Sequence, residues 1–424
     1  MMAQKNWNKQ KLKRLFKIKN GGTPKSNEPS YWEPGEVKWI TPEDLSTGNS
    51  HIRNSIRKIS FKGLENSSAT LVKAGSIVLS TRAPIGNVKI VKTPYATNQG
   101  CKSLEQNEKT DIRFFYYYLS INEEYLNQLG RGTTFLELSN SALKNLELSV
   151  PILPMQKAIS DYLDQRTSEI DALVSDKERL IELLEEKRQA MITETVTKGL
   201  DPNVKMKDSG IEWIGEIPEH WEVSPLFLEL AEVKHKNINL KEQNVLSLSY
   251  GRIIRRNVEA NFGLIPASFN TYNIVNQGDI VMRLTDLQND KRSLRVGYVT
   301  EKGIITSAYT TLSLSNNCRE RSKYYYYLLH SYDLQKIYYG LGDGVRQTMN
   351  YKDLKWLSLL KPPKSELAKI VSKLDELDST TKELIEYIRI QISKLKEYRE
   401  SLIYEAVTGK IDVRDYATET EEVH

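Results

Sequence analysis

Two stretches of the chain carry apolar residues at alternating steps of four and three, which is the spacing of a heptad seam. In residues 154–201 the seam positions are Ile159, Leu163, Arg166, Ile170, Leu173, Lys177, Leu180, Leu184, Lys187 and Met191. In residues 363–412 the matching positions are Ile370, Leu374, Leu377, Thr381, Leu384, Ile388, Gln391, Leu395, Tyr398 and Leu402. The pattern predicts two long helices. Because one small domain cannot bury either apolar stripe, we expect the helices to pair as an antiparallel coiled coil.

The residues outside these helices alternate short β-type runs with turn-rich loops. Examples of the runs are "SIVLS" at 76–80 and "DIVMRL" at 279–284, and an example of the loops is "NGGTPKSNEPSYWEPGE". Short runs of this kind between Gly- and Pro-rich loops are typical of strands joined by turns. The predicted fold class is α+β, with two globular domains separated by the two long helices.

The chain repeats itself with an offset of 211 residues. Residues 154–201 align with residues 365–412 without a gap, and 14 of the 48 pairs are identical, including Asp164 with Asp375. Upstream the likeness thins, although "FFYYYLS" still matches "KYYYYLLH" and "GSIVLSTR" matches "GDIVMRLT". A repeat of this length indicates two copies of one structural unit, and we expect a pseudo-twofold axis to relate them.

This repeat divides the 424 residues into five parts. We expect a first globular domain at 1–153, a central helix at 154–201, a second globular domain at 202–362, a distal helix at 363–412 and a tail at 413–424. The charge follows the same division, because the first and second globular segments carry net charges of +9 and +4 and each helical segment carries −4, counting the tail with the second helix. Basic domains suit a polyanion, and acidic helices suit a different partner.

The sequence lacks the common motifs of nucleotide-binding, metal-binding and catalytic sites. It contains no "GxxxxGK[ST]", "GxGxxG", "HExxH" or paired "CxxC", and its five histidines have no metal-ligand neighbours at usable spacing. We therefore expect no catalytic residue, no metal and no cofactor in this chain. With no apolar run of about 18 residues, no export signal and only two cysteines, we also expect a cytoplasmic protein without membrane contact.

The order of motifs resembles the specificity subunit of type I restriction-modification systems. The likeness rests on "LKNLELSVPILPMQKAISDYLDQRTSEIDALV", on "EKRQAMITETVTKGLDPNVKMKDSGIEWIGEIPEHWEV" and on the closing "LKEYRESLIYEAVTGKIDV". One departure is that the second helix opens "PPKSELAKI" where the first opens "LPMQKAI".

The resemblance implies a non-catalytic subunit whose two target-recognition domains each read half of a bipartite, asymmetric double-stranded DNA target. It implies that the helices measure the gap between the halves. Two methyltransferase subunits that use S-adenosylmethionine would dock on the chain, and restriction subunits that use ATP and magnesium would complete the nuclease. The alternatives are a coiled-coil adaptor without a DNA role, a specificity subunit of another restriction-modification class, and an enzyme in its own right.

By position, the loops "GGTPK", "STR" and "RGTT" and their counterparts in the second copy are the segments expected to face DNA. Arginine and lysine side chains contact phosphates or guanine, and glutamine can pair with adenine. The residues predicted to bind DNA are Thr23, Lys25, Ser80, Thr81, Arg82, Arg131, Thr133, Arg283, Thr285, Gln288, Lys291, Arg292, Arg295, Arg346 and Gln347.

Overall fold

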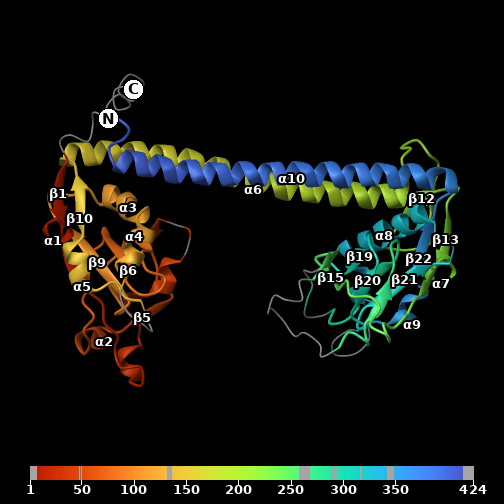
Figure 1. The fold of residues 1–424 in the computed structure, drawn as a ribbon, viewed down its shortest axis with the longest axis horizontal. Coiled ribbons are helices and arrows are strands. Elements are labelled where there is room, and N and C mark those ends of the chain that lie inside the picture. Colours follow the sequence, from red (N-terminus) through yellow and green to blue (C-terminus); the bar gives the residue numbers. More distant parts are fainter. Residues whose placement is uncertain are drawn as a thin grey trace. The chain divides into compact units, whose positions relative to one another are not determined.

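The chain folds into two compact units, and both long helices contribute residues to each unit (Figure 1). The computed structural model describes residues 7–46, 48, 50–130, 136–256, 268–287, 290, 294–315, 318–340 and 348–413. The first unit comprises Met1–Lys177 and Ile390–His424, and the second comprises Glu178–Arg389. The two predicted long helices are confirmed as α6 (Leu153–Lys198) and α10 (Lys364–Val407). The division between the units therefore falls inside both helices and not at their ends.

The globular part of the first unit, here called the first domain, runs from β1 to β10. Its largest sheet has five strands in the order β2-β9-β6-β7-β4, next to a three-stranded sheet β5-β3-β8 and the pair β1-β10. Its elements are β1 (Asn8–Lys11), α1 (Leu12–Leu15), β2 (Phe16–Asn20), η2 (Pro29–Tyr31), β3 (Val37–Ile40), η3 (Pro42–Leu45), β4 (His51–Ile52), β5 (Arg57–Ile59), α2 (Phe61–Glu65), β6 (Ser76–Ser80), β7 (Val88–Val91), β8 (Tyr95–Thr97), β9 (Cys101–Gln106), α3 (Ile112–Ser120), α4 (Glu123–Gln128), α5 (Asn140–Asn145) and β10 (Glu147–Val150).

The globular part of the second unit, here called the second domain, runs from β11 to β22. It has a four-stranded sheet in the order β14-β21-β18-β19 and four two-stranded pairs, β11-β12, β13-β22, β15-β16 and β17-β20. Its elements are β11 (Met206–Asp208), β12 (Glu216–Pro218), β13 (Glu222–Pro225), α7 (Leu226–Glu229), β14 (Leu230–Glu232), β15 (Leu246–Ser249), β16 (Arg252–Arg255), β17 (Asn273–Val275), β18 (Ile280–Met282), β19 (Val296–Tyr298), β20 (Gly303–Ile305), β21 (Thr310–Leu314), α8 (Arg319–Leu334), η4 (Ile337–Gly340), α9 (Tyr351–Leu354) and β22 (Ser358–Lys361).

The internal repeat of the sequence is also a repeat of topology. The strand order β2-β9-β6-β7 in the first domain corresponds to β14-β21-β18-β19 in the second, and the pair β1-β10 corresponds to β13-β22. Each large sheet is followed by a tyrosine-rich helix, α3 or α8, and then by a short capped helix, α5 or α9. The mixed α/β fold with two similar domains, predicted from the sequence, is therefore found in the structure.

In each unit the globular domain shares one hydrophobic core with parts of both long helices. In the first unit, Leu163 of α6 and Ile403 of α10 belong to the cluster that also holds the α3 residues Phe114 and Phe115. In the second, Ile192 of α6 and Ile370 of α10 join Tyr324 of α8. Within the first unit the two helices run antiparallel, because Asp171 pairs with Arg399 at 2.9 Å while Lys177, further along α6, bonds Gln391, earlier in α10, at 2.6 Å.

The predicted seam is correct at some positions of each helix and wrong at others. Leu173, Leu180, Leu384 and Tyr398 were expected in the seam, yet they are 50%, 43%, 42% and 58% exposed. In α6 the buried and half-buried stripe instead runs through residues 163, 167, 170, 174, 177, 181, 184, 188, 192 and 196. Up to residue 188 this stripe keeps alternating steps of four and three, and it shares residues 163, 170, 177 and 184 with the predicted seam. The other predicted positions, 166, 173, 180 and 187, are each replaced by the residue that follows, so the heptad spacing is correct and half of its positions are shifted by one residue.

Candidate nucleic-acid interface

In the first domain, two of the predicted DNA-facing segments, 21–25 and 80–82, are both bonded to the end of β8 and the turn that follows it. The backbone N–H of Thr81, just after β6, donates to the carbonyl of Gly100 at 2.8 Å, and the N–H of Leu138 donates to the carbonyl of Thr81 at 2.8 Å. The N–H of Gly22 donates to the carbonyl of Thr97 at 2.8 Å. Backbone hydrogen bonds thus connect the loops that follow β2, β6 and β8 and the segment just before α5.

Arg82 and Thr23 present exposed polar groups on this set of loops. Arg82 pairs with Glu137 at 3.1 Å, and their side chains are 45% and 39% exposed, so solvent screens the pair and it can open at little cost. The Thr23 hydroxyl donates to the side chain of Gln99, and Lys25 is exposed. For Thr23, Lys25 and Arg82 a role in binding DNA stays a prediction.

Ser80 and Thr81 are corrections to the predicted set, because both side chains are fully buried. The Ser80 hydroxyl donates to the Pro84 carbonyl at 2.6 Å and accepts from the N–H of Asn87 at 3.0 Å. The Thr81 hydroxyl donates to the Gly100 carbonyl at 3.2 Å. These hydroxyls satisfy backbone groups of the loop, as buried polar groups must, and they do not form part of its surface.

The second domain repeats the central contact. The N–H of Met349 donates to the carbonyl of Leu284 at 2.8 Å, which matches the bond from Leu138 to Thr81 in the first domain. Next to it, Arg283 is partly exposed and pairs with Asp290, and Thr285 is half-buried. For Arg283 and Thr285 a role in binding DNA stays a prediction.

Arg295 is a further correction, because its side chain is wholly buried. Its guanidinium donates to four backbone carbonyls of the loop that follows β18, those of Arg283, Thr285, Asp286 and Asp290, with distances of 2.8 Å to Thr285 and 3.1 Å to Asp286. The backbone N–H of Arg295 donates to the Asp333 carboxylate. Arg295 therefore shapes the loop from inside. The other predicted residues, Arg131, Thr133, Gln288, Lys291, Arg292, Arg346 and Gln347, lie outside the described residues.

Across the described part of the chain, the structure holds no cluster of three His, Cys, Asp or Glu side chains that could bind a metal ion. Within the same residues, none of the helices combines the length and the apolar character that crossing a membrane requires.

Comparisons with known proteins agree with this architecture. Residues 4–183 match the family model of the type I restriction modification DNA specificity domain. The type I restriction enzyme MjaIX specificity subunit of Methanocaldococcus jannaschii is 26% identical over 429 residues, which cover 97% of this chain and 95% of that protein. The chain is therefore similar over nearly its whole length to a type I restriction enzyme specificity subunit, and its first part matches the specificity-domain model.

Two solved structures share the fold of this chain. One, from work on complex assembly and conformational transition of the type I R-M system, has a TM-score of 0.67 at 15% identity and covers 96% of this chain and 99% of its own. The other, the HsdS subunit from Thermoanaerobacter tengcongensis, has a TM-score of 0.52 at 14% identity and covers 96% of this chain and 98% of its own.

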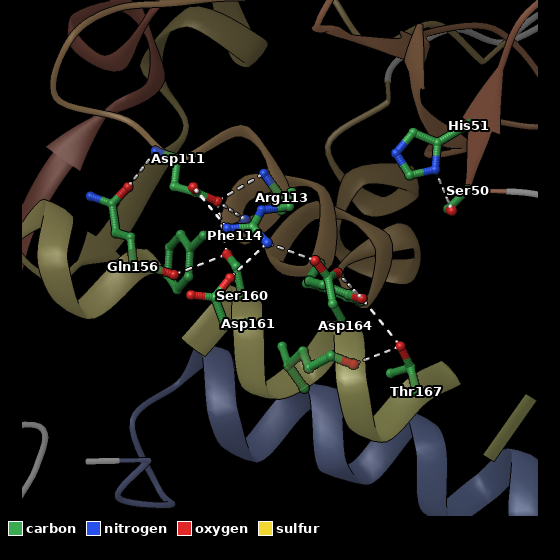
Figure 2. A network of polar contacts seen from close by, with 12 residues as sticks. Ser50, His51, Asp111, Arg113, Phe114, Gln156, Ser160, Asp161, Asp164 and Thr167 are labelled. Carbon is green, nitrogen blue, oxygen red and sulfur yellow. Dashed lines mark hydrogen bonds and ion pairs between the residues drawn. The ribbon is translucent and has the colours of Figure 1, made fainter. Parts of the chain in front are cut away.

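Each globular domain is bonded to a long helix by a tyrosine, a basic residue and an aspartate at matching positions of the repeat, a set of three side chains here called the latch. In the first unit the Tyr117 hydroxyl donates to Asp164 Oδ1 at 2.7 Å, and Arg113 Nη1 donates to Asp164 Oδ2 at 2.8 Å. Figure 2 shows Arg113 of α3 reaching Asp164, with Asp161 beside it on α6. Burial raises the pKa of Tyr117, so its hydroxyl stays protonated and remains a donor.

The second unit has the same latch with lysine in place of arginine. The Tyr327 hydroxyl donates to Asp375 Oδ1 at 2.8 Å, and Lys323 Nζ donates to Asp375 Oδ2 at 2.6 Å. Burial raises the pKa of Tyr327 as well. Reasoning from the sequence did not single out these residues. The repeat contained a signal for them, since Asp164 and Asp375 are identical at matching positions and the two tyrosine-rich segments also align.

The different openings of the two helices also have a structural reason. At the start of α6, Gln156 accepts from the N–H of Asp111 at 2.8 Å, and the Ser160 hydroxyl donates to the Asp111 carboxylate at 2.8 Å (Figure 2). At the start of α10, Leu367 joins the core and Glu366 accepts from the Trp221 indole at 3.0 Å. The "MQKAI" and "SELAKI" openings thus make different contacts with their own domains.

Proposed function

We propose that this chain is the non-catalytic DNA-recognition subunit of a type I restriction-modification enzyme, and that each recognition domain reads one half of a bipartite, asymmetric target. The observation that carries the proposal is the repeated arrangement of loops. In both domains the loop after the third strand of the sheet order is bonded to the segment before the short capped helix. Loops held by a rigid sheet are where proteins commonly place binding residues.

The charge of the segments supports DNA as the ligand. The globular segments carry net charges of +9 and +4, and phosphate contacts from lysine and arginine supply most of the sequence-independent affinity for DNA. The loops differ between the domains, because seven residues separate β6 from β7 whereas thirteen separate β18 from β19. Two domains that read different half-sites are expected to differ at such loops.

The proposal includes partners. We propose that two methyltransferase subunits, which bind S-adenosylmethionine and modify adenine, dock on the acidic helices, and that restriction subunits using ATP and magnesium join them in the cytoplasm. Because α6 and α10 both contribute to each unit, their lengths would set the gap between the half-sites.

Methylation mapping tests the proposal. The chain is produced in a methylation-free host together with a type I methyltransferase subunit, and modified adenines are mapped across the genome. The proposal predicts one bipartite motif with a fixed gap, which disappears when this chain is omitted. A motif that persists without the chain would overturn the proposal, and methylation or cleavage by the purified chain alone would identify an enzyme instead.

A further inference from the structure

The second unit contains a hollow of about 520 Å³ whose lining includes none of the residues predicted to bind DNA. It lies where the turn of the β15-β16 hairpin meets α6, α8 and α10. The hairpin supplies Tyr250 and Arg252, α8 supplies His330, and the long helices supply the charged residues Glu185, Arg188, Asp378, Lys382 and Arg389.

The charges on the inner part of this hollow balance one another. Arg188 pairs with Asp378 at 2.8 Å and with Glu185 at 2.9 Å, and its side chain is only 13% exposed. Lys382 pairs with the same Asp378 at 2.5 Å. Two cations and two anions therefore cancel, and neither carboxylate is left unpaired to repel an incoming anion.

The charges of two arginines at the opening of the hollow are not balanced by carboxylates of its lining. Arg252 is exposed and makes no ion pair with any residue that the structure describes. The Arg389 side chain is 62% exposed, and its nearest acidic partner, Glu386, lies at 3.8 Å and is itself 66% exposed. His330 adds no charge at neutral pH, because burial, with a further contribution from Arg188, lowers its pKa to about 4. The lining thus keeps two positive charges that face solvent.

The β15-β16 hairpin turns beside these arginines through Tyr250 and Gly251. Both residues have positive φ angles, +45° and +75°, which two-residue hairpin turns favour because the twist of the turn then matches that of the strands. Tyr250 is 74% exposed, so its ring gains little from packing. A Cβ on Gly251 would lie 2.9 Å from Leu294, so the turn is held close against the domain. The turn therefore presents an exposed aromatic ring next to Arg252.

We infer that this hollow binds a phosphodiester of the DNA backbone, with the guanidinium groups of Arg252 and Arg389 as its ligands and Tyr250 against the adjoining sugar. The inference rests on the proposed function, and it adds a contact that is independent of base sequence. Guanidinium groups match phosphate oxygens with two parallel hydrogen bonds, and they are less strongly hydrated than lysine. The exposed arginines leave the site open to a continuous strand.

Salt dependence of DNA binding tests the inference on the full chain. A fluorescent duplex of random sequence is titrated between about 50 and 200 mM salt, and the slope of log K against log salt is measured. Each lost phosphate contact makes the slope shallower by about 0.9. The variant Arg252→Gln with Arg389→Gln is expected to reduce the slope by about 1 to 2, whichever duplex is used.

The matched control is Arg255→Gln with Arg179→Gln. These arginines lie in the same hairpin and on the neighbouring helix, are exposed, and are already paired with Glu301 and Glu182. The control removes the same charge, so an equal change of slope in both double variants would overturn the inference while leaving the proposed function intact. A wild-type chain that binds no duplex at any salt would count against the proposed function itself.

A second measurement separates DNA from a free anion. Amide hydrogen exchange of residues 249–252 is recorded with inorganic phosphate at constant ionic strength and then with duplex. Protection by duplex alone supports the DNA assignment. Equal protection by inorganic phosphate would overturn it in favour of a small-anion site.

Discussion

The Tyr117 hydroxyl offers the most direct test of how a recognition domain is fixed to its helix. Tyr117→Phe removes one oxygen and nothing else from a side chain that is 5% exposed. The substitution removes a 2.7 Å bond to a carboxylate and a 3.2 Å contact with the Thr167 hydroxyl, and bonds to charged groups contribute about 1.5–3 kcal/mol. The Asp164 side chain is 44% exposed and remains paired with Arg113 in the variant. We therefore expect a loss of stability at the low end of this range, about 1.5 kcal/mol.

The assay is amide hydrogen exchange of α3 in the full chain, since two compact units need not unfold in one step. A loss of about 1.5 kcal/mol lowers the protection of the α3 amides roughly tenfold. The control is Tyr125→Phe, which removes a hydroxyl from a tyrosine of α4 that is 49% exposed. The reasoning is refuted if Tyr117→Phe and Tyr125→Phe leave the same protection. Tyr327→Phe should reproduce the effect on α8 in the second unit.

Three further outcomes follow from the contacts described. Arg113→Lys should keep the first latch, because the second unit makes it with lysine, whereas Arg113→Gln should lower α3 protection; equal loss in both variants would contradict the latch. Arg295→Lys keeps the charge but removes the guanidinium group that donates to four carbonyls. Chemical unfolding should therefore show that the free energy of unfolding of the second unit falls by about 3 kcal/mol. Wild-type stability would show that Arg295 does not hold the loop. Burial lowers the pKa of His330 to about 4 in the folded chain, whereas its pKa is about 6.5 in the unfolded chain. Between these pH values the unfolded chain binds one more proton than the folded chain. The free energy of unfolding of the second unit should therefore fall by about 3 kcal/mol as the pH falls from 6.5 to 4. His330→Gln should remove that part of the pH dependence, and an unchanged profile would contradict the assignment.

The repeat in the sequence predicted the topology well because it records the shared framework. Asp164 and Asp375 are identical positions at the offset of 211 residues, and the structure gives them the same tyrosine and cation partners. The predicted helix bounds, 154–201 and 363–412, lie within five residues of those of α6 and α10. Gly199, directly after α6, and Gly409, two residues after the end of α10, both adopt positive φ angles, +79° and +71°.

The candidate site was harder to predict because burial depends on contacts distant in sequence. Ser80 and Thr81 have the composition of a surface loop, yet their partners are backbone groups that only the folded loop brings near. Arg295 was predicted to contact DNA from its position in the loop and because arginine side chains contact phosphates or guanine. Its four carbonyl acceptors become a binding site for a guanidinium only when the loop after β18 closes around it.

A domain exchange tests the central claim most directly. Residues 202–362 are replaced by the corresponding domain of another type I specificity subunit, and adenine methylation is mapped for both proteins in the same host with the same methyltransferase. The account predicts that one half of the bipartite motif changes to that of the donor while the other half and the gap remain. A motif that changes in both halves, or in neither, would contradict the assignment of one half-site to each recognition domain.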